Sequence, residues 1–119
     1  MDSNQGIGTG IIIVYLAVVL LIIIAEWKVY QKAGKPGWAV IIPIYNIIVL
    51  LEIVKKPLWW IILFFIPIVN IVIAIIVIHR LSLSFGKEAG FTVGLILLPF
   101  VFYPILGFGD AQYSALPEG

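Results

Sequence analysis

The sequence predicts an all-α membrane protein, a bundle of four transmembrane helices that forms a single multi-pass domain over residues 1–119. Two observations predict this class. First, 63% of the 119 residues are hydrophobic and 11% are charged, whereas soluble domains contain about 25% charged residues. Second, four long windows, at residues 3–25, 36–51, 57–79 and 89–109, lack Asp, Glu, Lys and Arg. A bilayer core of about 30 Å needs roughly 20 apolar residues for each helix.

The first expected span, residues 7–29, continues as an unbroken apolar run. Its β-branched residues at 11–14 would favour a strand in water, but in lipid a helix satisfies its own backbone hydrogen bonds. The first ten residues contain no Lys or Arg, and no small-residue cleavage site follows the run. Both facts favour a retained helix over a signal peptide.

Three further spans are expected at residues 38–54, 58–78 and 91–108. The second is the shortest, because its residues reach only about 25 Å as a helix. A re-entrant second segment, which would leave three spans, is therefore an open alternative. Proline lacks the backbone donor that a helix interior requires, so the second, third and fourth helices are expected to be kinked. The residues responsible are Pro43, Pro67, Pro99 and Pro104.

Trp and Lys residues flank the expected spans, where aromatic and basic side chains meet the lipid headgroups. With the N-terminus outside, four crossings place five of the seven basic residues in the cytoplasm and predict that both termini face away from it. The three-span alternative divides the basic residues equally well, so charge does not separate the two arrangements. The expected interface anchors are Trp27, Lys28, Lys32, Lys35, Trp38, Trp59 and Trp60.

A motif occurs twice, starting at residues 35 and 56: Lys-Pro-x-Trp, followed by Ile-Pro-Ile-x-Asn-Ile. Each inner Pro frees a backbone carbonyl that needs another partner in lipid, and Asn46 and Asn70 can donate to such a carbonyl. In a four-span bundle the two asparagines would meet near mid-depth. The polar break, with Tyr45 beside Asn46, would form a permeation or ligand site in one interpretation. The favoured interpretation is an interhelical hydrogen bond of about 0.6–2 kcal/mol.

The sequence predicts no enzyme and no cofactor, metal or nucleic-acid site. It contains no Cys and a single His, His79, so no metal-ligand cluster is expected. A net charge of +1 leaves no basic face for nucleic acid. Ser82 and Ser84 precede Lys87 in a short loop, where the surroundings of a Ser/Lys hydrolase are not expected.

An ordered series of motifs resembles a small prokaryotic integral-membrane domain family of unknown function. The motifs are residues 27–34, Ile-Pro-Ile-Tyr-Asn at 42–46, Lys-Pro-x-Trp-Trp at 56–60, Ile-Pro at 66–67 with the later Asn, residues 84–87 and the ending at 98–110. A similar domain forms the N-terminus of some Bacteroidota signal peptidases. The resemblance implies a four-helix membrane fold. It does not extend to the peptidase domain, so peptidase activity is not expected.

We expect a non-enzymatic accessory or scaffold subunit in the prokaryotic cytoplasmic (inner) membrane. Its expected partners are the lipid bilayer and another membrane protein or a second copy of itself. A small transporter or channel built from the repeated kinked helices is the alternative. The spans offer few polar residues to line a solute pathway beyond Tyr45, Asn46 and Asn70, which favours the scaffold.

Overall fold

The computed structural model describes residues 3–117, and within that range it contains helices and no strand. The all-α prediction is therefore confirmed for the described residues. The elements follow in the order α1 (Ser3–Lys32), η1 (Gly37–Ile41), α2 (Pro43–Val54), η2 (Leu58–Phe65), α3 (Val69–Ser84), α4 (Ala89–Leu97) and α5 (Pro99–Phe108), where η denotes a 3-10 helix.

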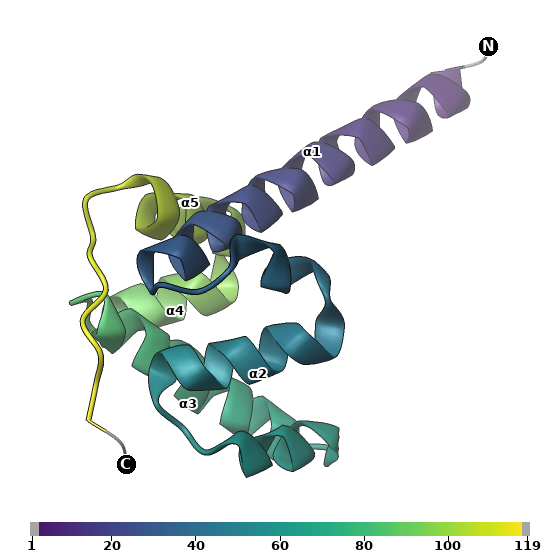
Figure 1. Cartoon of the computed structure of the whole chain (residues 1–119). Coiled ribbons are helices and arrows are strands. Elements are labelled where there is room, and N and C mark those ends of the chain that lie inside the picture. Colours follow the sequence, from purple (N-terminus) through teal and green to yellow (C-terminus); the bar gives the residue numbers. More distant parts are fainter. Residues whose placement is uncertain (1–2, 118–119) are drawn as a thin grey trace.

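The long helix α1 matches the first predicted span, residues 7–29. Its 30 residues correspond to about 45 Å of helix, and its N-terminal part projects away from the other elements (Figure 1). Among the described residues, Gly6–Lys32 is the one helix long and apolar enough to cross a membrane, and its most apolar window is not buried by the rest of the chain.

Each of the other three predicted spans consists of two short segments that fold back on each other. We call these the first hairpin (η1 with α2), the second hairpin (η2 with α3) and the third hairpin (α4 with α5); the two segments of each hairpin are in contact (Figure 1). The longest segment, α3, has 16 residues and reaches about 24 Å, less than the bilayer core of about 30 Å. The predicted four-span bundle is not confirmed.

Proline residues mark the three reversals instead of bending continuous helices. Pro43 is the first residue of α2 and Pro99 the first of α5, positions where the missing N–H is tolerated. Pro67 lies in the turn between η2 and α3. The prediction of kinked helices at these three positions is wrong. Pro104 does lie inside a helix, α5, which continues past it.

The breaks have a steric cause, because proline pushes the residue before it out of the helical region. Ile42 has φ −98° and ψ 110°, and Ile66 has φ −94° and ψ 119°. Leu98, which precedes the third proline, has φ −132° and ψ 60°. All three conformations lie outside the α region, so each helix ends before its proline; the next helix starts at Pro43 and Pro99, and two residues after Pro67.

The three reversals lie on one side of the molecule and the connections between hairpins on the other (Figure 1). The reversals are apolar and exposed: Ile68 is 78% exposed, Leu97 70% and Phe65 68%. The apolar part of α1 also projects on the side of the reversals. Exposed apolar surface of this extent is unusual in a soluble monomer, whereas lipid covers it without a hydration penalty.

The reversal of the second hairpin is a strained turn. Ile68 has φ 69° and ψ −51°, and the Val69 N–H donates to the Pro67 carbonyl at 2.8 Å. These features define the γ-turn with positive φ, which is rare and strained for a residue with a side chain. Packing of the surrounding hairpin must hold Ile68 in this conformation.

The buried core lies near the connecting segments, where the C-terminal part of α1 meets the hairpins. Gly107 allows α5 to approach α1 closely, because a Cβ there would lie 2.5 Å from the Ala25 carbonyl oxygen. The buried core cluster comes from α1, η1, α2, α3, the residue after α3, and α5: Val29, Tyr30, Ala39, Val49, Leu51, Ile53, Val54, Ile73, Val77, Leu81, Phe85 and Leu106.

Candidate functional site

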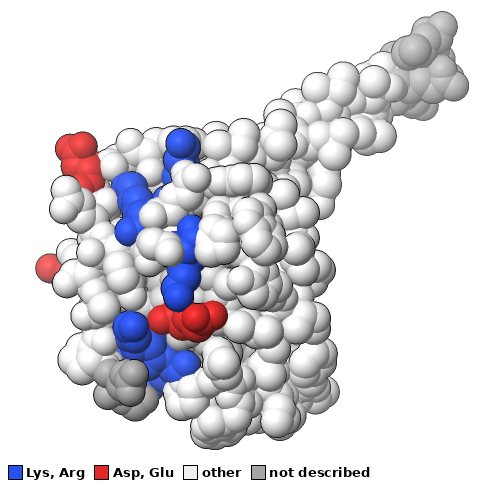
Figure 2. All heavy atoms as spheres, in the orientation of Figure 1, with Lys and Arg blue, Asp and Glu red and all other residues white. Residues whose placement is uncertain are grey.

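The charged side chains gather at the end of the molecule where the hairpins begin and finish. Figure 2 shows the Lys, Arg, Asp and Glu side chains over this end, while the projecting part of α1 is uncharged. We call this region the charged end. It is formed by the last turns of α1, α2 and α3, the segments that connect the hairpins, and the tail after α5. Its basic residues are Lys28, Lys32, Lys35, Lys55, Lys56, Arg80 and Lys87.

Lys32, predicted as an interface anchor, caps the last turn of α5. Its Nζ donates to the carbonyls of Leu106, Gly109 and Ala111 at 2.7, 2.9 and 2.8 Å. The final carbonyls of a helix have no partner within it and carry partial negative charge. The ammonium therefore joins the end of α1 to the end of the third hairpin.

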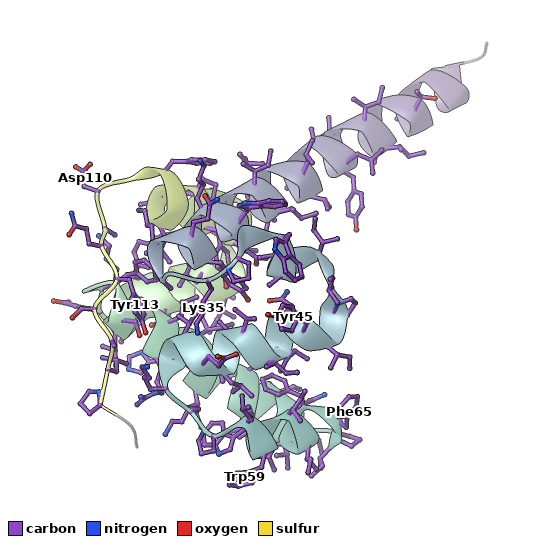
Figure 3. All side chains as sticks on the ribbon, in the orientation of Figure 1. Lys35, Tyr45, Trp59, Phe65, Asp110 and Tyr113 are labelled. Atoms are coloured by element: carbon purple, nitrogen blue, oxygen red, sulfur yellow. The ribbon has the colours of Figure 1, made fainter. Side chains whose placement is uncertain are left out.

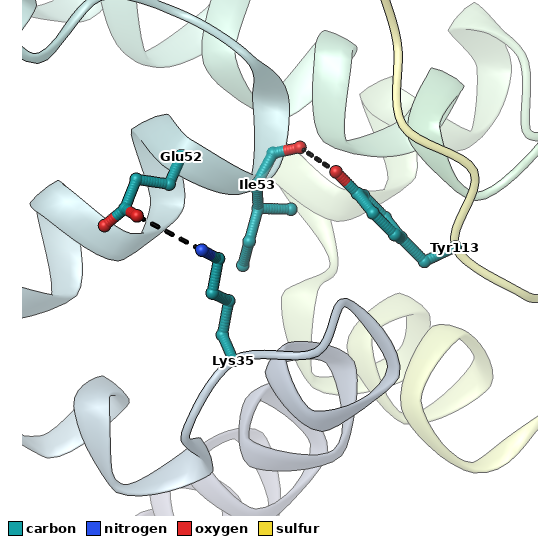
Figure 4. Close-up of polar contacts among 4 residues, drawn as sticks. All are labelled: Lys35, Glu52, Ile53 and Tyr113. Carbon is teal, nitrogen blue, oxygen red and sulfur yellow. Dashed lines mark hydrogen bonds and ion pairs between the residues drawn. The ribbon is translucent and has the colours of Figure 1, made fainter.

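Lys35 and Glu52 form an ion pair across the first hairpin, with Nζ and Oε2 3.1 Å apart (Figure 4). Beside it, the Tyr113 hydroxyl donates to the Ile53 carbonyl at 2.7 Å. Burial raises the pKa of the Tyr113 phenol, and the positive charge of Lys35 acts in the opposite direction. The neutral, hydrogen-bonding form of this side chain is therefore favoured in the folded protein.

The tail after α5 crosses the ends of the first two hairpins. Arg80 donates from Nε to the Val54 carbonyl at 2.7 Å and from Nη2 to the Pro117 carbonyl at 2.8 Å. The Ser114 N–H donates to the Ser84 carbonyl at 2.7 Å. These contacts hold the tail on the charged end, so the C-terminal segment lies on the opposite side from the hairpin reversals (Figure 3).

An open hollow of about 650 Å³ lies between the end of α1, the end of α2 and the start of η2. Its lining combines basic, acidic and apolar side chains: Lys35, Leu51, Glu52, Lys55, Lys56, Pro57 and Leu58. Sequence reasoning placed the first of the three lysines as an anchor and did not group it with the other two. The repeated Lys-Pro motif was the available signal, since it puts one lysine before each of the first two hairpins.

Asn46 is a structural residue inside the first hairpin. The Tyr30 hydroxyl donates to Asn46 Oδ1, and Asn46 Nδ2 donates to the Val40 carbonyl at 3.2 Å. This amide thus joins α1, η1 and α2. Among the described residues, Asn46 and Asn70 do not bond to each other, so the expected pairing of the two asparagines is not found; Asn46 instead takes the other expected kind of partner, a backbone carbonyl that precedes the proline. Tyr30 was not identified from sequence as the partner.

The predicted tryptophan anchors have different surroundings. Trp27 packs against Gly37, where a Cβ would lie 1.9 Å from the indole Cδ1. Trp38 stacks on Tyr45, with ring centroids 5.3 Å apart, and so joins the two segments of the first hairpin.

Trp59 and Trp60 lie edge to face at the start of η2, with ring centroids 6.4 Å apart. Trp59 is 59% exposed, as expected of a residue that contacts lipid headgroups or acyl chains. Lys28, the remaining predicted anchor, is exposed on α1.

The polar residues of α3 and α4 form local contacts. His79 Nδ1 lies 2.9 Å from Thr92 Oγ1, Ser82 donates to the Glu88 carbonyl at 3.1 Å, and Ser84 donates to the Arg80 carbonyl at 2.7 Å. The Ser82 hydroxyl therefore stabilises the turn between the second and third hairpins, whereas the Ser84 hydroxyl bonds within the last turn of α3. Over the described part of the chain, no group of three or more His, Cys, Asp or Glu residues is placed to hold a metal ion.

Comparison with known proteins defines the class. The chain belongs to a family of unknown function, DUF5684, which matches residues 38–115. The matched region comprises all three hairpins and most of the tail, and α1 precedes it. Searches of the curated proteins and of the solved structures found no match. The similarity to the membrane domain of signal peptidases stays a prediction from the sequence.

Proposed function

We propose that this protein is a non-enzymatic scaffold subunit of a prokaryotic cytoplasmic membrane, anchored by α1 and by three hairpins that enter the bilayer from one side. The observation that carries the proposal is the separation of charge from apolar surface. All seven basic residues lie in the last turns of α1 and α3 or in the segments that connect the helices at the charged end, whereas the reversals and the projecting part of α1 are apolar and exposed.

Segment lengths support this arrangement over four crossings. The apolar part of α1 before Lys28 is long enough for a core of about 30 Å. The hairpin segments reach about 10–24 Å and return to the side from which they started. Backbone at a reversal within the bilayer needs internal partners; Asn46 supplies one by donating to the Val40 carbonyl.

Basic residues favour the cytoplasmic side of a membrane. With every Lys and Arg at one end of the molecule, the proposal places that end and the tail in the cytoplasm and the start of α1 outside. This differs from the sequence-based expectation that both termini face outward, because that expectation depends on four crossings.

Single cysteines test the arrangement cleanly, since the chain has no Cys of its own. Cysteine would replace one residue in each polar segment, at Gln31, Pro57, Glu88 and Gln112, and a membrane-impermeant maleimide would be applied from each side. We expect all four to react from the cytoplasmic side. Four spans would instead expose positions 57 and 112 outside, and the three-span alternative would expose position 88 alone. Either pattern would overturn the proposal.

The scaffold role requires a protein partner within the bilayer, and α1 offers the surface for it. Residues in this part of α1, such as Leu16 at 58% exposure, are exposed, and the projecting part of the helix stands clear of the other elements (Figure 1). A photo-cross-linking residue at position 16 should give one product of defined mass in native membranes, and the same residue at the reversal position Leu97 should give lipid products only. If both positions gave lipid products only, the proposal of a protein partner for α1 would be wrong.

The transporter alternative receives less support. A permeation site needs polar groups that are available to solute, but the Asn46 amide is already bonded to Tyr30 and Val40. Tyr45 stacks on Trp38. We therefore propose that the repeated motif stabilises the structure of the hairpins and does not line a solute pathway.

A further inference from the structure

The hollow at the charged end has the composition of a site for an amphiphilic anion. Its lining includes Lys35, Lys55 and Lys56, and Glu52 is the one acidic residue among the described residues that line it. The formal charge of these described lining residues is therefore +2, from three lysines and one glutamate. The lining also includes the apolar residues Leu51, Pro57 and Leu58.

We propose that this hollow binds the phosphate headgroup of an anionic phospholipid. The inference rests on the membrane location in the proposed function and adds a specific ligand to it. Basic pockets on the cytoplasmic side of membrane proteins take such headgroups. A lipid ligand, unlike free phosphate, also requires a path for its acyl chains, and the structure offers one.

The acyl-chain path follows η2 from the hollow toward the reversal of the second hairpin. Leu58 is 51% exposed, Trp59 59% and Ile62 62%, and Phe65 at the far end is 68% exposed. Figure 3 shows Trp59 and Phe65 at opposite ends of this segment, with Lys35 on the side of the charged end. A phosphate held by the lysines thus lies directly beside an exposed apolar strip.

The ammonium groups are held in different ways. Lys35 is paired with Glu52 at 3.1 Å, and its side chain is 31% exposed. Lys56 Nζ lies over the Trp60 ring, 4.9 Å from its centroid. The partial exposure of Lys35 leaves its ammonium accessible to an oxygen ligand, and the contacts of both side chains reduce the conformational entropy that binding must remove.

The backbone of Lys55 supplies a second, independent observation. Lys55 follows the last turn of α2 with φ 61° and ψ 45°, the left-handed conformation that usually favours Gly or Asn at a helix end. Lysine is less stable in this conformation than Gly or Asn, so Lys55 is an unfavourable residue for the end of a helix. Such departures concentrate at functional sites, and this one adds a positive charge to the lining of the hollow.

Lys55→Asn separates binding from folding, because Asn tolerates the left-handed conformation. Lys87→Asn is the matched control: it removes the same charge from the charged end, in the segment between α3 and α4 and outside the hollow. The full chain would be reconstituted in phosphatidylcholine nanodiscs containing a small fraction of phosphatidylglycerol with brominated acyl chains. Tryptophan quenching reports binding, since Trp59 and Trp60 lie beside the hollow.

We expect stronger quenching by brominated phosphatidylglycerol than by brominated phosphatidylcholine. Lys55→Asn should weaken the preference about fivefold, the value that corresponds to about 1 kcal/mol for one basic residue near a lipid surface. Its thermal stability should equal or exceed that of the parent. Lys87→Asn should change the preference less than twofold. If both variants lost the preference for phosphatidylglycerol equally, the preference would come from general surface electrostatics, and the proposed lipid site would be wrong.

Inorganic phosphate distinguishes the two sources of the same chemistry. If the parent showed no preference for brominated phosphatidylglycerol but bound inorganic phosphate saturably in a calorimetric titration, and Lys55→Asn weakened that binding, the hollow would be a site for soluble phosphate and the lipid assignment would be wrong. Failure of the proposed membrane arrangement would give a different result. The pattern of cysteine labelling would change, while Lys55→Asn would still weaken the preference for the anionic lipid.

Discussion

The first and second hairpins carry the same motif, with Lys-Pro-x-Trp at the start and Ile-Pro-Ile-x-Asn-Ile around the reversal, yet the motif has different surroundings in each. In the first, Asn46 bonds to Tyr30 of α1 and to Val40 of η1. In the second, Asn70 lies in the first turn of α3, a helix that packs against η2, α4 and α2. The asparagine is thus a tertiary contact in one copy and a local residue in the other.

The lengths of the two copies explain part of the difference. The distance from Lys to Asn is three residues longer in the second copy, and the 3-10 helix grows by the same amount, from five residues in η1 to eight in η2. The extra residues lengthen the first segment of the hairpin. The reversal then needs a tighter turn, in which Ile68 adopts positive φ, whereas the equivalent Ile44 lies within α2.

The largest difference between the two hairpins is expected when the asparagine of each is replaced by leucine. Asn46→Leu should lower the free energy of unfolding by about 1–2 kcal/mol, because the Tyr30 hydroxyl and the Val40 carbonyl lose their partner. Asn70→Leu should change it by less than about 0.5 kcal/mol. Unfolding in mixed micelles with increasing dodecyl sulfate measures both.

The double variant sharpens this contrast. Since the asparagines do not pair, the effects of Asn46→Leu and Asn70→Leu should add within about 0.5 kcal/mol. Tyr30→Phe combined with Asn46→Leu should not add, because both remove one shared hydrogen bond. Coupling between the two asparagines would contradict the separation of the hairpins.

Glycine at the two isoleucines should act in opposite directions. Ile68→Gly should raise the free energy of unfolding by about 0.5–1 kcal/mol, since glycine adopts positive φ without strain. Ile44→Gly should lower it by about 0.5–1 kcal/mol, because glycine is unfavourable within a helix. Both side chains are exposed, at 78% and 51%, so lost packing contributes little. The same micelle unfolding measures them, and equal signs would show that the turn is not strained.

The sequence predicts the helical class, the presence of a long N-terminal helix over residues 7–29 and the prolines at which the later helices break, because these depend on local composition and on proline. It predicts neither hairpins nor the partners of Asn46. A proline before an apolar run is compatible with a kinked span and with a reversal, since both place the preceding residue outside the α region. The choice depends on which segments pack together, and that information lies in contacts such as Tyr30 with Asn46.

The residues of the candidate site are also only partly predictable from the sequence. The lysines are visible as charges at segment ends, and the repeat relates Lys35 to Lys56. Their convergence with Lys55 on one hollow requires both ends of the first hairpin to lie on the same side, which the expected four crossings exclude. The left-handed backbone of Lys55 has no sequence signal, because lysine is not a residue that usually adopts it.

The smallest effect is expected at the tail, which joins the ends of the two compared hairpins. The Tyr113 hydroxyl donates to the Ile53 carbonyl of the first hairpin, and its ring lies 5.7 Å from that of Phe85 after the second. Tyr113→Phe keeps the ring contact and removes the hydrogen bond. The free energy of unfolding should fall by about 0.5 kcal/mol, at the low end for a neutral hydrogen bond.

The pH dependence gives this variant a second readout. Burial raises the pKa of Tyr113 above its ordinary value, so above about pH 10 the unfolded chain releases this proton before the folded one. The folded state then binds more protons, and stability must fall as pH rises. The parent should therefore lose more stability than Tyr113→Phe between about pH 9 and 11, a comparison in which the titration of the lysines cancels. Parallel curves would show that the phenol is solvated and that the tail does not join the two hairpins through this bond.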